Sequence, residues 1–337
     1  MKDKLILKAL DGTNSRVPVW LMRQAGRHLP EYRALKEKYT FLELCKTPDV
    51  AVEASLQPLR RYDMDGVICF SDILVPLEAM GMKLDFNPGP VFEDPITSIE
   101  QFRALELPPI KQNIPHILET LEKLRDELKD TNKTLLGFTG APYTLASYAI
   151  EGKTSKHFEA IKSWSYRAPN ELLEILDGLS DLTARYIEAQ HEAGAELVQI
   201  FDTWAGQLSL EDYRRFALPG TKKIIENSRS KGIPITLYIN GGYHLIPGMI
   251  EAKPDVISVD WRRSISDYLA LIPEEICVQG NLDPAFLFAS PQEVKAETKK
   301  ILEAAKGRKF ILNLGHGLLP TTPIDSVKAF VDTALES

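Results

Sequence analysis

The chain of 337 residues is 44% hydrophobic and 26% charged, a composition typical of a soluble globular protein with a sizeable buried core. Its 40 basic residues are outnumbered by 47 acidic ones, and the net charge of −7 argues against nucleic acid or an anionic membrane surface as a partner. Three cysteines without a CxxC pair, no signal peptide and no apolar run approaching ~18 residues predict a cytoplasmic protein without disulfides or a cysteine zinc site.

Short apolar runs bounded by turn residues recur along the whole chain and predict eight buried strands. They are residues 17–22, 66–70, 134–138, 196–201, 234–239, 255–259, 276–279 and 310–314. Stretches with helical periodicity lie between most of them, among them 114–129, 171–194 and 291–307. This alternation predicts an α/β protein, a single (β/α)8 TIM barrel that spans residues 1–337 as one catalytic domain. A doubly wound open sheet is the second possibility, but it favours a glycine-rich phosphate turn, and neither GxGxxG nor a P-loop motif occurs.

The first predicted strand runs directly into Arg23 and Arg27, which are four residues apart. If the chain turns helically after Met22, both guanidinium groups fall on one face. Such a pair suits carboxylates or phosphates bound bidentately, although arginines at a strand end also form structural ion pairs with acidic residues. Gly26 favours a ligand, because backbone without a side chain allows close approach.

Polar and glycine residues follow the later strands, at the ends that converge on the mouth of a barrel, where binding and catalysis occur. Asp72 follows the second strand and precedes an apolar stretch, so its carboxylate needs a cation or several donors to stay charged; an N-cap of the next helix is the alternative. His316 follows the last strand between two glycines, where either ring nitrogen could bond a ligand. Tyr143 and Tyr148 follow the third strand, and their spacing is also typical of core residues.

The chain resembles the uroporphyrinogen decarboxylase family over nearly its whole length. The resemblance rests on PVWLMRQAGRHLPEYR (18–33), GVICFSDILVPLEAMGM (66–82), GFTGAPYTLASYAIEG (137–152), QIFDTWAG (199–206), QGNLDP (279–284) and NLGHGLLPTTP (313–323). The chain departs from the family at Tyr143, where tryptophan is usual, and at His28, where tyrosine or phenylalanine is common.

The resemblance implies a (β/α)8 barrel that forms a homodimer and uses neither a metal nor an organic cofactor. The implied reaction removes CO2 from the four acetate side chains of uroporphyrinogen III, a tetrapyrrole, to give coproporphyrinogen III. Carried over by position, the catalytic residues are Asp72, Arg23 and Arg27. The implied substrate contacts are Arg23, Gln24, Ala25, Gly26, Arg27, Asp72, Tyr148, Thr203 and His316.

The chemistry of this reaction agrees with the residues present. A substrate with eight carboxylates needs concentrated arginine donors in an acidic protein. Protonation of the pyrrole provides an electron sink within the substrate, and an anion such as Asp72 would stabilise the cation that forms. The proton donor could be an arginine-bound water, an arginine, Asp72 or His316, and we rank His316 lower.

Two alternatives belong to other classes of protein. Related barrels transfer methyl groups from corrinoids or folates and hold a zinc ion through His and Cys ligands, but Cys277 is the only strand-end cysteine and has no histidine two residues before it. A tetrapyrrole-binding protein without turnover would keep the arginines and have no need of Asp72.

Overall fold

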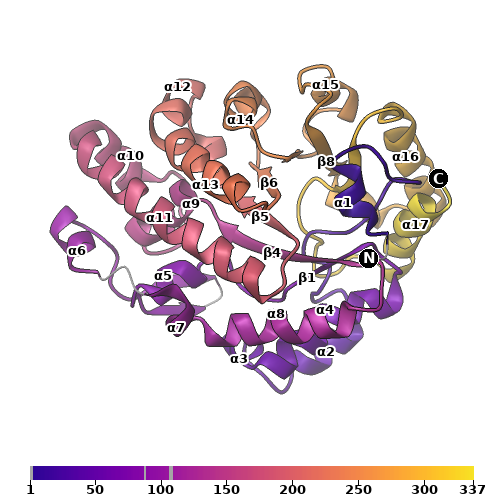
Figure 1. Ribbon diagram of the computed structural model, residues 1–337, viewed down its shortest axis with the longest axis horizontal. Coiled ribbons are helices and arrows are strands. Elements are labelled where there is room, and N and C mark those ends of the chain that lie inside the picture. Colours follow the sequence, from indigo (N-terminus) through magenta and orange to yellow (C-terminus); the bar gives the residue numbers. More distant parts are fainter. Residues whose placement is uncertain (1–2, 87–88, 106–108) are drawn as a thin grey trace.

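A computed structural model describes residues 3–86, 89–105 and 109–337. Its centre is a seven-stranded parallel sheet in which strands that follow one another along the chain are neighbours, in the order β1-β4-β5-β6-β7-β8-β9 (Figure 1). The strands are β1 Gly66–Ile68, β4 Thr134–Gly140, β5 Leu197–Phe201, β6 Ile235–Tyr238, β7 Val256–Ser258, β8 Cys277–Leu282 and β9 Phe310–Leu314. Most strand residues are buried, as expected for a sheet covered on both faces. The fold is the (β/α)8 barrel type that the strand pattern predicts.

The first predicted strand, residues 17–22, is not a regular strand, and this part of the prediction is wrong. It forms one isolated parallel bridge, Val19 to Leu312 of β9. The segment nevertheless lies between β9 and β1: the Leu312 N–H donates to the Pro18 carbonyl at 2.9 Å, and the Asp65 N–H donates to the Val19 carbonyl at 2.8 Å. Pro18 has no N–H to extend a ladder. The segment therefore fills the eighth position of the barrel with few ladder bonds of its own.

Asp65 fixes this eighth segment to β1. It is fully buried, and its carboxylate receives both terminal nitrogens of Arg16 at 2.8 Å each and the Val19 N–H at 2.8 Å. The chain that leads to Arg23 is thus held by a bidentate ion pair and by backbone hydrogen bonds.

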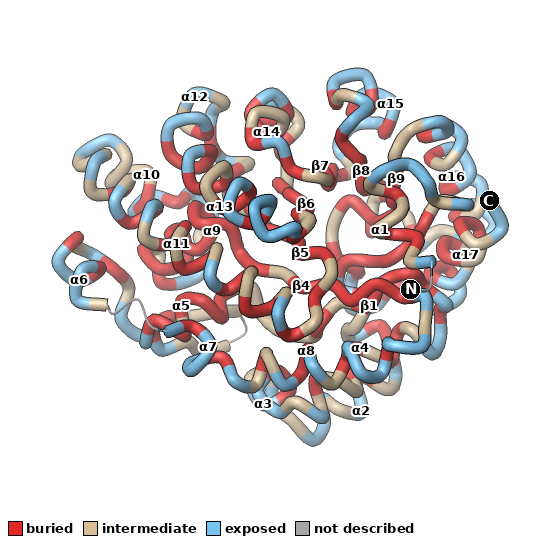
Figure 2. Tube along the Cα trace, in the orientation of Figure 1, coloured by how far each residue is buried: buried red, intermediate tan, exposed pale blue. Residues whose placement is uncertain are grey.

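Helices form the outer layer. In Figure 2 buried and exposed residues alternate along these helices, so each helix has one face toward the core and one toward solvent. In α8, for example, the buried residues Ile117, Leu121, Leu124 and Leu128 recur every three or four positions. The helices are α1 Leu5–Ala9, α2 Pro30–Lys36, α3 Phe41–Lys46, α4 Pro48–Arg61, α5 Val75–Ala79, α6 Ile99–Ala104, α7 Ile110–Asn113, α8 Pro115–Leu128, α9 Pro142–Glu151, α10 Glu159–Arg167, α11 Pro169–Ala193, α12 Leu210–Asp212, α13 Leu218–Ser230, α14 Ile246–Ala252, α15 Ile265–Leu269, α16 Pro291–Ala304 and α17 Ile324–Leu335. The three helices predicted at 114–129, 171–194 and 291–307 correspond to α8, α11 and α16. In the described part of the chain, no helix is both long and apolar enough to cross a membrane.

The connection after β1 contains a two-stranded antiparallel hairpin that the apolar pattern did not predict. It pairs β2 Leu84–Phe86 with β3 Pro90–Phe92. Its strands have three residues each, too short for a periodic signal. The hairpin matters for function because Asp85, Phe86 and Pro90 line the pocket described below.

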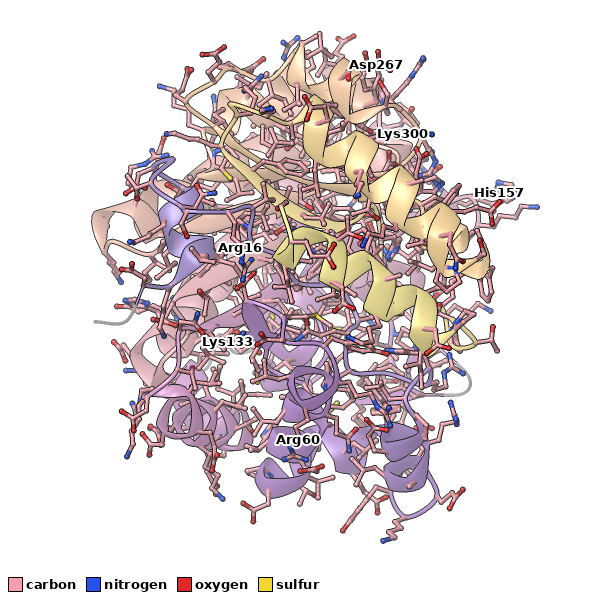
Figure 3. The ribbon with its side chains drawn as sticks, turned by 90° about the vertical axis from the view of Figure 1, so that its right-hand side faces the viewer. Arg16, Arg60, Lys133, His157, Asp267 and Lys300 are labelled. Atoms are coloured by element: carbon pink, nitrogen blue, oxygen red, sulfur yellow. The ribbon has the colours of Figure 1, made fainter. Side chains whose placement is uncertain are left out.

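Loss of the Asp65 carboxylate is expected to destabilise the protein strongly. Asp65→Ala leaves Arg16 and the Val19 N–H without their partner, and removing one member of a buried pair costs about 3 kcal/mol. Glu53→Ala is the matched control, since it removes the bidentate partner of Arg60 on α4, an exposed pair whose loss should cost under about 1 kcal/mol. Arg16 and Arg60 are labelled in Figure 3.

Denaturant midpoints of the two variants and the wild type measure this difference. Equal losses in the two variants would show that Asp65 does not fix the eighth segment.

Candidate active site

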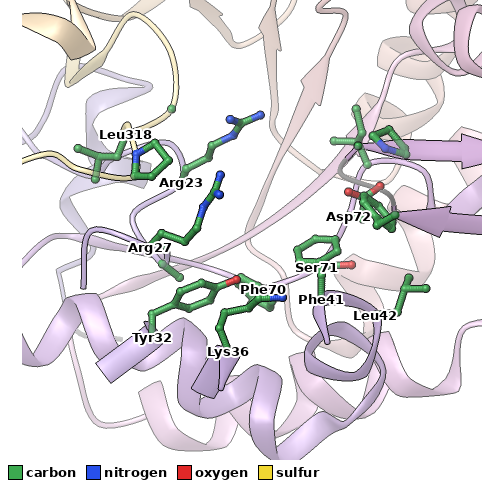
Figure 4. Close-up of a pocket in the computed structure, with 18 of the residues that line it drawn as sticks. Arg23, Arg27, Tyr32, Lys36, Phe41, Leu42, Phe70, Ser71, Asp72 and Leu318 are labelled. Carbon is green, nitrogen blue, oxygen red and sulfur yellow. The ribbon is translucent and has the colours of Figure 1, made fainter. Parts of the chain in front are cut away.

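A cavity of about 1030 Å³ opens where β1, β4 and β5 end. Ile68 and Phe201, the last residues of β1 and β5, and Phe138 near the end of β4 contribute to its wall, together with the loops at residues 22–28 and 316–320. The volume lies at the upper end of the range for small-molecule sites, so the cavity can hold a ligand larger than a typical metabolite. Figure 4 shows Arg23 and Arg27 on one side of this pocket and Asp72 on the other.

The arginine loop has a different conformation from the one the sequence suggested. The expected helical turn after Met22 is absent: Arg23 takes the left-handed conformation, with φ of 57°, and the Gln24 N–H donates to the Leu21 carbonyl at 3.1 Å. Both arginine side chains still extend into the pocket (Figure 4). Among the described residues, no carboxylate lies within ion-pair distance of Arg23 or Arg27, so the alternative of a structural ion pair has no support there.

Gln24 has a different role from its neighbours. Its side chain is fully buried and does not line the pocket, whereas Ala25 and Gly26 do. The Gln24 amide nitrogen donates to the Gly66 carbonyl at 3.0 Å, and its oxygen accepts from the Leu21 N–H at 3.2 Å. A direct substrate contact by this side chain therefore does not fit the structure, because both of its polar atoms are engaged: the nitrogen fastens the loop to β1 and the oxygen closes the turn within the loop.

Asp72 lies in the loop between β1 and α5, and its carboxylate faces the pocket. The Leu74 N–H donates to Oδ1 of Asp72 at 2.8 Å. The N-cap of α5 is Leu74, because the helix begins at Val75, so Asp72 is not the cap of that helix. Burial raises the pKa of the Asp72 carboxyl to about 6, against the opposing effects of the Leu74 amide and the positive charge of Arg23. At neutral pH Asp72 is mainly ionised, and it can accept a proton under mildly acidic conditions.

His316 is a neutral imidazole whose orientation is fixed. The Gly317 N–H donates to Nδ1 at 2.6 Å, which places the ring proton on Nε2. Burial, together with the charges of Arg23 and Arg262, lowers the pKa of His316 to about 4. The ring packs against Tyr238 and Trp261, with centroid distances of 5.8 and 6.5 Å. His316 can thus donate one hydrogen bond to a ligand without carrying a charge.

Tyr148 and Thr203 also line the pocket, whereas Tyr143 does not. Tyr148 lies on α9 with 9% of its surface exposed, and its ring packs against Trp204 at 5.8 Å. Burial raises the pKa of Tyr148, and the nearby Asp72 charge adds to this effect. Tyr143 is 2% exposed and belongs to the core. The two tyrosines of this segment therefore divide between site and core.

Lys36 and Tyr32 line the pocket and were missed by the sequence analysis. They are four residues apart on α2, so they share one face of that helix, and Figure 4 shows both beside the arginines. Within the described ranges Lys36 has no ion-pair partner. The sequence feature that could have identified them is the helical spacing of an aromatic and a basic residue directly after the arginine loop.

Other polar residues at the strand ends support the mouth and do not line the pocket. Asp202 is fully buried and accepts from Thr144 Oγ1 at 2.9 Å, and burial raises its pKa to about 7. Asp260 is 1% exposed and accepts from Tyr268 and from the Gly241 N–H. No group of three or more His, Cys, Asp or Glu residues in the described ranges is arranged to hold a metal ion.

Comparisons with known proteins agree on one family. The sequence model of the family described as uroporphyrinogen decarboxylase matches residues 1–337. The uroporphyrinogen decarboxylase of Geobacter sulfurreducens is 43% identical over 318 residues, which cover 94% of this chain and 93% of the relative. That of Citrifermentans bemidjiense is 44% identical over 317 residues, with 94% and 93% covered.

Solved structures support the fold. A methyltransferase from Methanosarcina mazei has a TM-score of 0.85 at 23% identity and covers 99% of this chain and 98% of its own. A B12-independent methionine synthase from Shewanella sp. W3-18-1 has a TM-score of 0.60 at 13% identity, with 89% and 91% covered. At these identities the likeness extends to the fold alone.

The Asp72→Asn variant is expected to be more stable than the wild type above pH 6. The difference in stability should disappear as the pH falls. The folded-state pKa of about 6 lies above the ordinary value of 3.8. Between these two values the folded state binds more protons than the unfolded state, so wild-type stability falls as the pH rises through the window. The amide of the variant carries no charge and avoids the free-energy cost of keeping an ionised carboxylate in this pocket. We set this cost at about 1 kcal/mol, a reduced value because solvent reaches the carboxylate.

Denaturant midpoints of wild type and variant between pH 4.5 and pH 8 measure this effect. Stability curves that stay parallel across the range would show that the environment of Asp72 does not raise its pKa.

Proposed function

The chain belongs to the uroporphyrinogen decarboxylase family, and on this premise we propose that the pocket at the strand ends binds and decarboxylates uroporphyrinogen. The activity itself follows from the family: the chain is a carboxy-lyase that converts acetate side chains of this tetrapyrrole to methyl groups and needs no cofactor. The predicted reaction class is thereby confirmed. The roles of individual residues are our proposal.

The observation that carries the proposal is a set of cations without counter-ions. Arg23, Arg27 and Lys36 line one pocket, and the described structure places no carboxylate within ion-pair distance of any of them. The protein as a whole has a net charge of −7, so this local set is the feature that attracts an anion. A substrate with eight carboxylates supplies the missing partners, and the two arginines offer planar donor pairs for them.

Asp72 is proposed as the anion that faces the pyrrole N–H groups. Loss of CO2 requires protonation of the pyrrole, so positive charge develops on the ring as the reaction proceeds. A carboxylate held in place beforehand stabilises that charge without reorganisation. With a pKa of about 6, Asp72 is mainly ionised at neutral pH and needs no prior deprotonation.

The proton donor is a separate question, and the electrostatics of the pocket favour some candidates over others. His316 has a pKa of about 4, so it is neutral at physiological pH and a poor proton donor. We assign it a hydrogen bond from Nε2 to a substrate carboxylate. Asp72, an arginine or a water bound by Arg23 or Arg27 stay as candidates for the acid.

The remaining contacts are assigned by position. Tyr148 and Thr203 line the pocket and carry hydroxyl groups that can bond substrate carboxylates. Ala25 and Gly26 contribute small surfaces between the two arginines, so the substrate can approach the backbone there. Gln24 acts indirectly, through the loop that it holds.

The barrel methyltransferase alternative is not favoured. The methyltransferase from Methanosarcina mazei shares the fold at 23% identity, whereas relatives at 43% identity carry the decarboxylase name. Zinc analysis of purified protein tests this alternative, and stoichiometric zinc would support it.

Substitution of Asp72 is expected to separate binding from turnover. In an assay with anaerobically prepared uroporphyrinogen, Asp72→Asn should lower kcat by at least about 100-fold with substrate still bound, because it removes a preorganised charge. Arg27→Ala should raise KM by about tenfold or more, the loss of one charge-assisted contact. Asp283→Asn is the matched control: Asp283 is another strand-end carboxylate, it accepts from the Ala285 N–H and does not line the pocket, and its loss should leave both constants unchanged.

The outcomes discriminate between the alternatives. A wild-type protein that binds uroporphyrinogen but releases no CO2 would be a carrier, and the enzyme proposal would fail. Full activity of Asp72→Asn would remove Asp72 from its proposed role.

We propose further that residues 1–337 form one catalytic domain, that the enzyme works in the cytoplasm and that it is a homodimer. The family match over all 337 residues supports the first point. The second is supported by three buried cysteines that form no disulfide, as expected in a reducing compartment. The homodimer rests on the resemblance to the family.

Sedimentation equilibrium of the purified protein is expected to give twice the mass of the chain across a range of concentrations. A single species with the mass of one chain at micromolar concentration would contradict the homodimer.

A further inference from the structure

Two loops that are far apart in the sequence cross at the pocket wall. One is the turn at Arg23, after the eighth barrel segment, and the other is the loop at His316 and Gly317, after β9. The Leu318 N–H donates to the Met22 carbonyl at 3.0 Å and ties the two backbones together. The bridge between Val19 and Leu312 fixes the same two segments deeper in the barrel. Their separation at the wall is therefore set by the barrel and not by the side chains that lie between them.

Gly317 lies directly against the aliphatic part of the Arg23 side chain. A Cβ atom built on Gly317 would lie 3.0 Å from Cβ of Arg23, 2.5 Å from Cγ and 2.3 Å from Cδ. Real Cβ atoms do not approach other atoms below about 3.0 Å. The crowded atoms belong to the stem of Arg23 and not to its mobile end, so a small adjustment of the guanidinium would not relieve the contact.

The backbone of Gly317 does not itself require glycine. Gly317 is not among the glycines with positive φ, so alanine can adopt its conformation. The three atoms nearest to the added Cβ all belong to the Arg23 side chain. The need for glycine is therefore a need for the space that Arg23 occupies.

Arg23 cannot move away easily, because its backbone is fixed. It has a φ of 57°, a conformation that few non-glycine residues adopt, and it lies in the turn closed by the Gln24 N–H and the Leu21 carbonyl. The buried side chain of Gln24 fastens this turn to β1 through the Gly66 carbonyl. The direction in which the Arg23 side chain leaves the backbone is thus determined by the turn.

The Arg23 charge acts on two polar groups of the pocket. The charge lowers the pKa of Asp72 and also that of His316, so the guanidinium lies within electrostatic reach of both. His316 immediately precedes Gly317, and its Nδ1 accepts from the Gly317 N–H. One short loop therefore holds the imidazole and also leaves the space for the guanidinium.

We propose that Gly317 is a positioning residue for Arg23: the absence of a side chain at Gly317 lets the Arg23 stem cross the loop, and this crossing sets where the guanidinium meets the substrate. The part that concerns substrate rests on the proposed function. The crossing itself is a property of the fold and can be tested without turnover.

A double-mutant cycle tests the proposal. In the wild-type background Gly317→Ala is expected to lower kcat/KM for uroporphyrinogen about tenfold or more, chiefly through KM. In the Arg23→Ala background, where the stem is gone, the same substitution should change kcat/KM less than twofold. The Arg23→Ala background is the matched control, because it keeps the loop and removes only the side chain that Gly317 accommodates. Equal losses in the two backgrounds would overturn the proposal.

Titration of His316 by NMR gives a second readout that needs no activity. The charges that act on His316 come from Arg23 and Arg262, which lower its pKa, and from Asp260, which raises it. Displacement of the Arg23 guanidinium should raise the pKa of His316 in Gly317→Ala in the same direction as in Arg23→Ala. A pKa that rises in Arg23→Ala and stays at the wild-type value in Gly317→Ala would show that the guanidinium has not moved.

Failure to fold is also informative. If Gly317→Ala does not fold but the double variant does, the crossing is confirmed, since removal of the Arg23 stem restores the protein. If neither folds, Gly317 is required for another reason and the proposal is wrong. An inactive wild-type protein would refute the proposed function, and the His316 titration would still decide whether the crossing positions Arg23.

Discussion

The structure depends on keeping two guanidinium groups in a cavity without a carboxylate partner of their own. In the described residues Arg23 and Arg27 have no acidic group within ion-pair distance, although the protein is acidic overall. Charges in a partly enclosed site favour pairing, so the chain must hold these side chains where acids do not reach them. Three devices do this: Asp65 fixes the barrel segment that leads to the loop, Gln24 fastens the turn, and Gly317 leaves space for the Arg23 stem.

The same cations affect the titratable groups around them in different ways. Burial raises the pKa of Asp72 and the Arg23 charge opposes this rise, whereas burial and the Arg23 charge both lower the pKa of His316. The result at neutral pH is one mainly ionised carboxylate and one neutral imidazole in the same pocket. A developing cation and a substrate carboxylate need opposite environments, and this pocket supplies both, chiefly through burial, with the Arg23 charge as a smaller influence on each group.

The strand pattern predicted the barrel, and the strand-end positions drew attention to Asp72 and His316, whereas Tyr148 and Thr203 were implied as site residues by the family resemblance; all four line one pocket. The sequence could not show that residues 17–22 form only one bridge, because Pro18 and the tertiary partner Asp65 decide this. It could not show that the Gln24 side chain turns away from the pocket, because the left-handed turn at Arg23 depends on contacts with β1 and β9. Lys36 was missed because its helix is short and comes between two loops.

The strand-end carboxylates differ in how many hydrogen bonds they already accept and in whether they face the pocket. Asp260 accepts from Tyr268 and Gly241, and Asp283 accepts from the Ala285 N–H outside the pocket. Asp202 has an oxygen without a partner in the described structure, but it is fully buried behind the pocket wall, and its pKa of about 7 keeps a large share of it protonated at neutral pH. Asp72 combines a single donor from Leu74 with a place on the pocket wall. It is therefore the strand-end carboxylate of these four that can meet a new positive charge on a bound ligand, and the barrel prepares this position by engaging the others elsewhere.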